Sequence, residues 1–158
     1  MIRVLFVCLG NICRSPMAEG ILRHMLEEQD LQDKVYVDSA GTSTYHLGEL
    51  ADYRTRKVLT NKGITLTHEA RQIQAEDFET FDYILAADKS NIENILKVRP
   101  STQEAKEVIL IRQFDPSNTG EEVPDPYHGN MGHFEEVYSM LEDTLEAFLS
   151  YLKEKHKL

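Results

Sequence analysis

Tryptophan is absent from the 158 residues, and cysteine is nearly absent, since only Cys8 and Cys13 occur. Two cysteines five positions apart cannot join distant parts of the chain, and their spacing does not match that of zinc ligands. The opening apolar stretch covers only residues 4–9, too few to span a bilayer, and no small-residue cleavage pattern follows it. These absences predict a cytoplasmic protein in a reducing compartment, with no membrane segment.

Positive charge is also scarce. Lys and Arg number 17 against 27 Asp and Glu, which gives a net charge of -10 and a pI near 5.0. Such a molecule repels nucleic acid and anionic membranes, so we expect neither as a partner. A small anionic group would bind only where local positive groups outweigh the overall field. The hydrophobic fraction of 41% is otherwise that of a globular protein, and residues 1–158 suit a single domain.

Short apolar runs alternate with helical patterns along the chain. Strands are predicted at residues 2–8, 35–38, 83–87 and 108–111, with the first at the centre, and the helices lie between and after them. This alternation predicts an α/β fold: one three-layer domain in which a four-stranded parallel sheet carries helices on both faces. In such folds ligands bind at the carboxyl ends of the strands.

Turn and cap residues indicate where these elements end. Residues 39–42 are turn-prone and should close the second strand. Gly63 is placed to end the helix after that strand, and Asp88 or Ser90 to begin the next helix. Residues 113–132 are dense in Asp, Pro, Asn and Gly, and are predicted to form a long loop.

The segment from Cys8 to Ser15 places a thiol at the end of a predicted strand and Arg14 at the start of a predicted helix. A helix N-terminus offers unpaired N–H groups and a partial positive charge, which also favours the thiolate form of a cysteine. Gly10 and Asn11 readily adopt the left-handed backbone that turns successive N–H groups inward. Arg14 adds a planar fork for two phosphate oxygens. We therefore expect a phosphate-binding loop at the C-terminal end of the first strand.

Cys8 and Arg14 alone do not decide between a catalytic site and a buried structural cysteine, but the strand and helix around them favour catalysis. Attack of a thiolate on phosphorus forms a phosphocysteine, and the departing oxygen then needs a proton. Asp125 lies between Pro124 and Pro126 in the predicted long loop and is the candidate acid. An Asp between prolines is also typical of a simple turn.

Together these two segments resemble the low-molecular-weight protein-tyrosine phosphatases. The family's loop has the form C-x-G-N-x-C-R-S, which stands here at residues 8–15, and its Asp-Pro-Tyr segment stands at residues 125–127. The likeness extends over essentially the whole chain. It implies hydrolysis of phosphotyrosine in proteins and of small aryl phosphates, with no metal and no cofactor. Phosphotyrosine proteins would be the partners, and we expect a monomer or a weak homodimer.

The resemblance also implies roles for individual residues. Cys8 would attack phosphorus, Arg14 would bind the phosphoryl oxygens, and Asp125 would act first as acid and then as base. Ser39 and His68 would support the loop together with Asn11, without His68 acting as a base. Contacts with the substrate are implied for Leu9, Gly10, Asn11, Ile12, Cys13, Ser15, Tyr45 and Tyr127. Ser15 would also activate the thiol. Cys13 would either form a disulfide with the nucleophile or simply fill space. His128 departs from the aromatic residue that often follows Asp-Pro-Tyr.

Several other functions share this loop. Thioredoxin-coupled arsenate reductases need further cysteines, and the sequence has none after Cys13. Protein-arginine phosphatases typically carry Thr at the place of Ile12 and lack the Tyr of Asp-Pro-Tyr, so Ile12 and Tyr127 favour phosphotyrosine. A non-catalytic phosphate-binding module or a redox-sensing module is a further alternative. A pure binder would not need Asp125.

Overall fold

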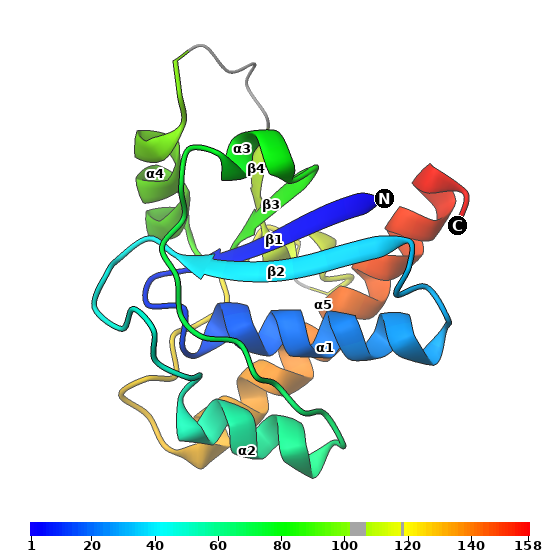
Figure 1. The fold of residues 1–158 in the computed structure, drawn as a ribbon. Helices are drawn as coiled ribbons and strands as arrows, with labels where there is room; N and C mark the ends of the chain where they lie inside the picture. Colours follow the sequence, from blue (N-terminus) through cyan, green and yellow to red (C-terminus); the bar gives the residue numbers. More distant parts are fainter. Residues whose placement is uncertain (102–106, 118) are drawn as a thin grey trace.

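A computed structural model describes residues 1–101, 107–117 and 119–158. One sheet of four parallel strands lies at its centre, in the order β2-β1-β3-β4 (Figure 1). The strands are β1 (Ile2–Cys8), β2 (Val35–Gly41), β3 (Tyr83–Ala86) and β4 (Val108–Leu110). β1 is flanked on both sides, since Cys8 pairs with Gly41 and Val7 pairs with Ala86. The predicted parallel sheet is confirmed, and its first strand is one of the two interior strands.

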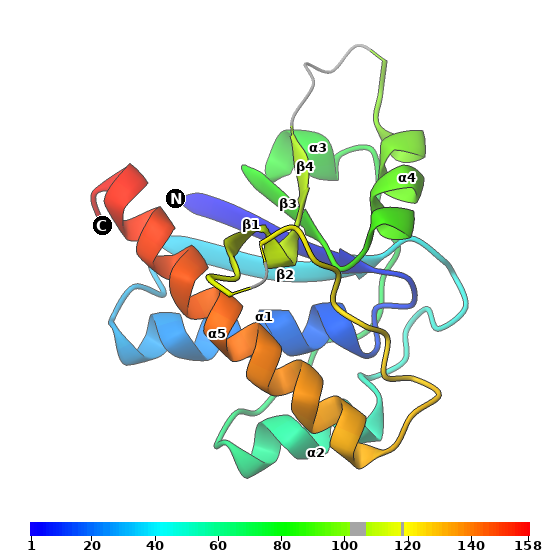
Figure 2. The same cartoon turned by 180° about the vertical axis from the view of Figure 1, so that it is seen from behind.

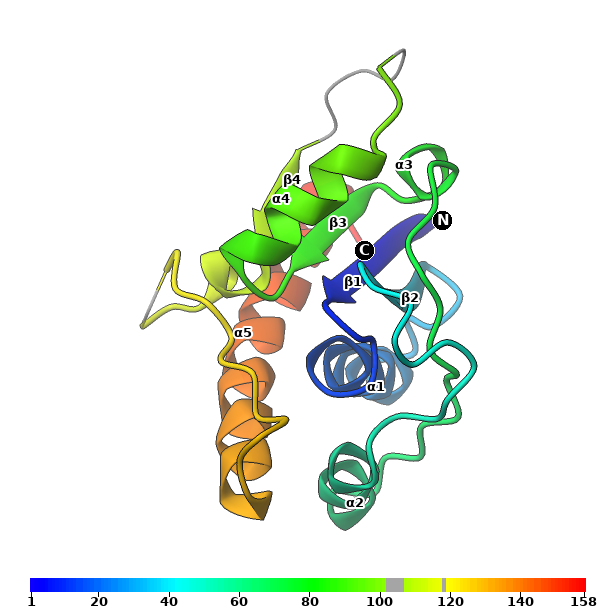
Figure 3. The same ribbon diagram turned by 90° about the vertical axis from the view of Figure 1, so that its left-hand side faces the viewer.

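Helices cover both faces of this sheet. They are α1 (Arg14–Glu28), α2 (Tyr53–Asn61), α3 (Asp77–Thr80), α4 (Lys89–Val98) and α5 (Met131–His156), with a 3-10 turn η1 (Ile111–Phe114). α1 and α5 lie on one side and α4 on the other, as the end-on view shows (Figure 3). The reverse view shows α5 crossing the sheet diagonally, with α2 packed beside its first turns (Figure 2). The predicted three-layer α/β architecture is confirmed.

The apolar side chains of β1 belong to two separate hydrophobic clusters. Val4 and Phe6 belong to the larger cluster, which α1 and α5 share, whereas Leu5 and Val7 belong to a smaller cluster on the opposite face. All four side chains are fully buried. Alternate residues of a strand point to opposite faces, and a strand covered on both faces is therefore apolar throughout. This double burial fixes the position of Cys8 at the strand's carboxyl end.

Residues 39–41 belong to β2, so the turn predicted for residues 39–42 is wrong over most of its length. Ser39 and Ala40 continue the parallel ladder with Phe6 and Val7. The ladder satisfies their backbone groups, which outweighs the local turn preference of the sequence. As a result the second strand reaches as far as Cys8 does, and its last residue lies against the phosphate-binding loop.

The predicted helix ends are largely confirmed. Gly63 has a φ of +79° and donates its N–H to Thr60, while Ile64 donates to Leu59, a paired arrangement that closes α2. Asp88 begins α4 by accepting from the N–H of Asn91 at 2.8 Å. The capping residue is therefore Asp88 and not Ser90. The four-residue helix α3 was not predicted, because it is too short for a periodic pattern.

The strand predicted at residues 108–111 ends at Leu110, and the long loop predicted at 113–132 overlaps η1 at its start and α5 at its end. Residue 118, within that loop, lies outside the described residues. Val123 anchors the segment by donating its N–H to the carbonyl of Ala87 at the end of β3. Among the described helices, none combines the length and apolar character needed to cross a membrane.

Candidate active site

The loop between β1 and α1 turns at Asn11, whose φ of +58° is left-handed as predicted. Gly10, in contrast, does not adopt the left-handed backbone expected of it. The position favours glycine for a different reason, because a Cβ on Gly10 would lie 3.0 Å from Cδ2 of His46. No side chain caps the start of α1 at Cys13. The N–H groups of its first turn therefore remain available to a ligand.

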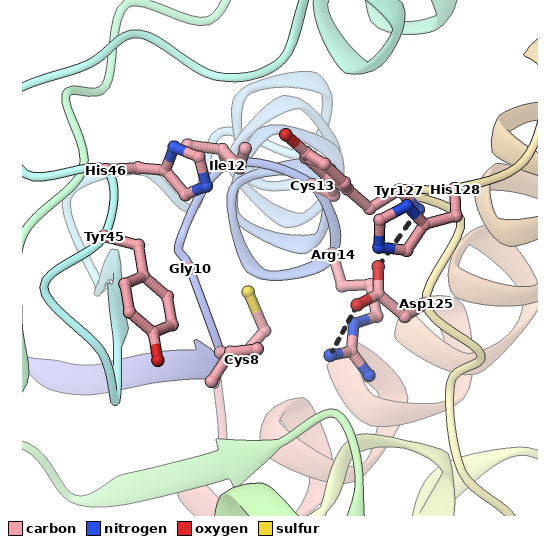
Figure 4. Close-up of a pocket in the computed structure, with 11 residues that line it drawn as sticks. Cys8, Gly10, Ile12, Cys13, Arg14, Tyr45, His46, Asp125, Tyr127 and His128 are labelled. Carbon is pink, nitrogen blue, oxygen red and sulfur yellow. Dashed lines mark hydrogen bonds and ion pairs between the residues drawn. The ribbon is translucent and has the colours of Figure 1, made fainter.

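The loop forms the floor of a cavity of about 240 Å³. The thiol of Cys8 lies between Tyr45 on one side and Arg14 with Asp125 on the other (Figure 4). The described residues that line this cavity are Cys8, Leu9, Gly10, Ile12, Cys13, Arg14, Tyr45, His46, Asp125, Tyr127 and His128. Most of the residues predicted to contact the substrate are thus brought together. The side chains of Asn11 and Ser15 are not, since they are buried behind the loop.

Ser15 supports Cys8 from behind. Its Oγ lies 3.0 Å from Sγ of Cys8 and accepts a hydrogen bond from Nδ2 of Asn11 at 2.8 Å. Oγ of Ser15 can also donate to the carbonyl of Ala40, but at 3.4 Å that contact is longer than the one to the sulfur. A hydroxyl donor and the N-terminus of α1 both favour a negative sulfur. A hydroxyl group and the start of α1 thus both lie beside the sulfur of Cys8.

Asn11 holds the loop through four contacts. Its amide nitrogen also donates to Ser39 at 3.0 Å, while Oδ1 accepts from the backbone N–H of Arg71 at 3.0 Å and lies 2.7 Å from Nε2 of His68. Ser39 and His68 therefore occupy the supporting positions predicted for them. Asn11 is left-handed and almost fully buried, so these contacts are what offsets its backbone cost.

Glu19 completes this network and was not predicted. Its carboxylate accepts from Ser39 at 2.7 Å, lies 3.2 Å from Nδ1 of His68, and pairs with Arg23 at 2.7 Å. Burial raises the pKa of Glu19, against the lowering effects of His68, Ser39 and Arg23. An acidic residue on the buried face of an amphipathic helix was the available signal, because such a charge needs partners.

The sequence predicted no cluster of metal ligands, yet the fold brings Glu19, Asp38 and His68 within reach of one another in the described part of the chain. The two carboxylates are already paired, with Arg23 at 2.7 Å and Arg71 at 3.1 Å. Their positive partners make the cluster an ion-pair network. It lies behind the phosphate-binding loop, outside the cavity lining.

Arg14 is 3% exposed and is held along one edge. Its Nη1 donates to Asp88 at 2.8 Å and to the carbonyl of Val123 at 2.9 Å, while Nη2 lies 3.7 Å from Asp125. Burial acts to lower the pKa of Arg14, but Cys8, Asp88 and Asp125 outweigh it and raise the pKa above its ordinary value. The guanidinium is therefore charged, with its second edge at the cavity.

Asp88 was predicted only as a helix cap. It serves both purposes, since Oδ1 caps α4 and Oδ2 holds Arg14. The signal for the second role was its place directly after β3, because neighbouring parallel strands end at one edge of the sheet. His46 was also missed. Its ring lies against the cavity and pairs with Glu49 at 2.8 Å, in a segment without any regular pattern.

Asp125 reaches the cavity from the segment before α5. Its side chain is 45% exposed, and Oδ1 accepts the N–H of Tyr127 at 3.1 Å, so the carboxylate is fixed by its own turn. The ring of Tyr127 lies 6.0 Å from that of His46 and 5.0 Å from that of His128. Together they form one wall of the opening. Asp125 and Cys8 thus both line the same cavity.

Cys13 lies in the wall and, like Cys8, is a free thiol. Burial is the main cause that raises the pKa of Cys13, with further contributions from Asp52, Cys8 and Asp125. Its thiol is therefore protonated at neutral pH.

The chain was compared with known proteins. Residues 3–158 match the family described as low molecular weight phosphotyrosine protein phosphatase. A protein of that name from Schizosaccharomyces pombe is 44% identical over 149 residues, which cover 94% of this chain and 95% of the relative.

Solved structures show the same likeness. A protein tyrosine phosphatase from Entamoeba histolytica, with Hepes in its active site, is 39% identical and has a TM-score of 0.90, with both chains fully covered. A Drosophila arginine phosphatase is 35% identical, with a TM-score of 0.87 over 96% of this chain and 98% of its own. The match of sequence, fold and length places the chain in the low-molecular-weight phosphotyrosine protein phosphatase family, a family of cysteine-dependent hydrolases.

Proposed function

We propose that this enzyme hydrolyses phosphotyrosine in proteins, and small aryl phosphates, through a phosphocysteine on Cys8. The observation that carries the proposal is the meeting of Cys8, Arg14 and Asp125 around one cavity, although Asp125 is more than a hundred positions away from the loop. A thiol, a buried charged guanidinium and a carboxyl group at one cavity are the parts that this chemistry requires.

In the first step the thiolate of Cys8 attacks phosphorus, and the bond between phosphorus and the tyrosyl oxygen breaks. The N–H groups at the start of α1 and the free edge of Arg14 bind the phosphoryl oxygens, where negative charge accumulates. Asp125 gives its proton to the departing phenolate. The products are neutral tyrosine and a phosphocysteine.

In the second step the carboxylate of Asp125 takes a proton from water, and the water oxygen attacks phosphorus. The bond between sulfur and phosphorus breaks, which releases inorganic phosphate and regenerates the thiolate. Ser15 stabilises the sulfur as a leaving group through its contact of 3.0 Å. No step needs a metal, because Arg14 and the backbone N–H groups supply the positive charge.

The walls of the cavity suit an aromatic ring. Leu9, Ile12, Tyr45 and Tyr127 lie above the phosphate-binding floor and give it apolar sides, and Tyr45 is 78% exposed at the opening. A ring held there places its phosphate over Cys8. We also propose that residues 1–158 act as one catalytic domain, in the cytoplasm, as a monomer or weak homodimer. Phosphotyrosine proteins are the substrates, and neither nucleic acid nor membrane is a partner.

A second candidate substrate is phosphoarginine in proteins. The likeness to an arginine phosphatase from Drosophila favours it. Ile12 and the ring of Tyr127 argue for phosphotyrosine instead, since both add apolar surface around the entering group. Assays on matched phosphotyrosine and phosphoarginine peptides distinguish the two, and we expect the higher kcat/KM for phosphotyrosine.

The proposal is tested by turnover of p-nitrophenyl phosphate and of a phosphotyrosine peptide in the presence of EDTA. We expect EDTA to leave both rates unchanged and orthovanadate to inhibit competitively. Cys8→Ser should abolish turnover but leave a folded protein that still binds vanadate. Arg14→Lys should lose nearly as much activity, because a point charge cannot replace the two-pronged guanidinium.

Four results would contradict this account. Turnover restored only by an added divalent ion would mean that a metal supplies the charge assigned to Arg14. A Cys8→Ser enzyme with substantial activity would exclude the covalent route. Near-normal rates in Arg14→Lys would show that another group binds the phosphate. A wild-type protein that binds phosphotyrosine but shows no turnover would favour the alternative of a non-catalytic binding module.

A further inference from the structure

Arg54 joins α2 to the segment that carries Asp125. Its Nη1 donates to the carbonyl of Gly129 at 2.9 Å, and its Nη2 donates to the carbonyl of Tyr127 at 2.9 Å. The first turns of α5 lie beside α2 (Figures 1 and 2). One side chain therefore holds two carbonyls of a single turn of this segment, and Tyr127 is the residue whose N–H is bonded to Asp125.

The guanidinium of Arg54 is itself fixed from two other directions. Nε and Nη2 form a fork on the carboxylate of Asp52, at 3.0 and 2.9 Å. Its carbon lies 4.3 Å from the centre of the fully buried ring of Phe134, in the first turn of α5. Burial opposes the charge of Asp52, but the hydrogen bonds from Arg54 outweigh it and lower the pKa of Asp52. The pair therefore stays charged at neutral pH, with little freedom of orientation.

The same helix end is tied to the phosphate-binding loop. Asp52 donates its backbone N–H to the carbonyl of Ile12 at 2.8 Å, and Thr55 Oγ1 lies 3.4 Å from the carbonyl of Cys13. The backbone N–H of Asp52 thus contacts the loop, while the side chain of Asp52 binds Arg54. Arg54, which contacts none of the reacting groups, is not among the residues that line the cavity.

We infer that Arg54 is a positioning residue, which sets the distance between Asp125 and the phosphate bound at Cys8. The inference rests on the proposed function, because it assigns Arg54 an effect only through Asp125. The side chain of Asp125 is 45% exposed and is held by the N–H of Tyr127 and by the ion pair with Arg14 at 3.7 Å, so its place at the cavity depends in part on how residues 127–129 are held. Displacement of a reacting group by about 1 Å costs up to about 10²-fold in rate.

The inference predicts a selective loss. Arg54→Gln removes the fork and the bonds to both carbonyls, so proton transfer to the leaving group should weaken while phosphate binding persists. We expect kcat/KM for a phosphotyrosine peptide to fall about tenfold, and that for p-nitrophenyl phosphate to fall much less, because its leaving group needs little help. Inhibition by orthovanadate should stay at the wild-type level.

Arg56→Gln is the matched control. Arg56 lies on the same helix and carries the same charge, but its side chain donates to the carbonyl of Ala51, just before the start of α2. Its removal should leave both rates unchanged. Arg54→Lys is a second variant in case Arg54→Gln folds poorly, because it keeps a cation beside Phe134 but cannot bind both carbonyls. It should show the same selective loss, and thermal unfolding of each variant reports the fold.

The deciding measurement repeats Arg54→Gln in an Asp125→Asn background. If Arg54 acts through Asp125, the second substitution adds almost no further loss on phosphotyrosine. Equal losses on the two substrates, or the full loss repeated in the Asp125→Asn background, would overturn the inference. If Asp125→Asn alone affects both substrates equally, the acid assignment fails and the inference fails with it. If Asp125→Asn discriminates and Arg54→Gln does not, only the role of Arg54 is wrong.

Discussion

At the scale of single residues, the central feature of the site is that Arg14 is held along one edge. Asp88 and the carbonyl of Val123 occupy Nη1, and this leaves Nη2 toward the cavity at 3.7 Å from Asp125. A buried guanidinium without partners would be costly, and one with every donor satisfied would have nothing left for phosphate. The observed division gives both a fixed orientation and a free binding edge.

Asp125 is the residue whose role is most easily separated from the rest. A general acid contributes roughly 10²- to 10⁴-fold, and more for a basic leaving group. We therefore expect Asp125→Asn to slow phosphotyrosine hydrolysis much more than hydrolysis of p-nitrophenyl phosphate. The alkaline limb of the pH profile should also flatten, because the wild-type acid loses its proton there and the amide has none to lose.

Rates for both substrates across pH check this expectation. Equal losses on the two substrates, with the alkaline limb retained, would identify Asp125 as a turn residue. The acid would then be another ionisable residue of the cavity lining, and His46 and His128 are two candidates. Asp125→Glu is a useful companion, because it keeps the proton but moves it by one methylene group.

The roles of residues could be predicted where the residues lie close together in the sequence. Cys8 and Arg14 lie in one short segment between a strand and a helix, and local spacing places them at one point. The contact of Glu19 with Ser39 and that of Asp88 with Arg14 were not predicted. They depend on which strands end side by side, and no local pattern contains this information. The same reason hid Arg54, whose partners lie more than seventy positions further along the chain.

At the scale of secondary-structure elements, the close approach of β2 to the phosphate-binding loop is the decisive contact. A Cβ on Gly41 would lie 2.7 Å from the carbonyl oxygen of Leu9 and 3.1 Å from the backbone nitrogen of Asn11. Both atoms belong to the loop backbone, which cannot move aside as a flexible side chain can. The full length of β2 thus determines the shape of the phosphate-binding loop. The turn-prone sequence of residues 39–42 did not predict this length.

This contact gives a prediction for Gly41→Ala. The added methyl group should push the loop away from β2 and lower kcat/KM by about 10- to 100-fold, through misplaced N–H groups. Gly63→Ala is the control. Gly63 has a φ of +79° with open space around it, so alanine there should cost about 1 kcal/mol of stability but leave kcat unchanged.

Thermal unfolding and steady-state kinetics of both glycine variants test the point. Gly41→Ala with normal kinetics would mean that the loop tolerates displacement from β2. A matching loss of activity in Gly63→Ala would mean that general destabilisation explains both effects. The order of elements needed no such detail, since alternating strand and helix patterns already predicted the parallel sheet and its two covered faces.

At the scale of the whole molecule, a strongly acidic protein places a buried guanidinium and a helix N-terminus at one cavity. Under the proposed function, the net charge of -10 repels phosphorylated substrates at long range, whereas Arg14 and the start of α1 attract a phosphate that has reached the floor. Segments far apart in the sequence line this cavity: the end of β1 with the following loop and the start of α1, the loop after β2 with Tyr45 and His46, and the segment before α5. Only the folded chain brings them together, so catalysis is a property of the assembled sheet.

The central claim is that the phosphoryl group passes through Cys8, and trapping that intermediate tests it most directly. Wild-type enzyme is mixed with a phosphotyrosine peptide, denatured rapidly during turnover, digested and analysed by mass spectrometry. Cys8→Ser, treated in the same way, is the control. The account predicts one phosphoryl group on the peptide that contains Cys8, and none in the control. Turnover without this adduct, or a phosphoryl group on any other residue, would contradict it.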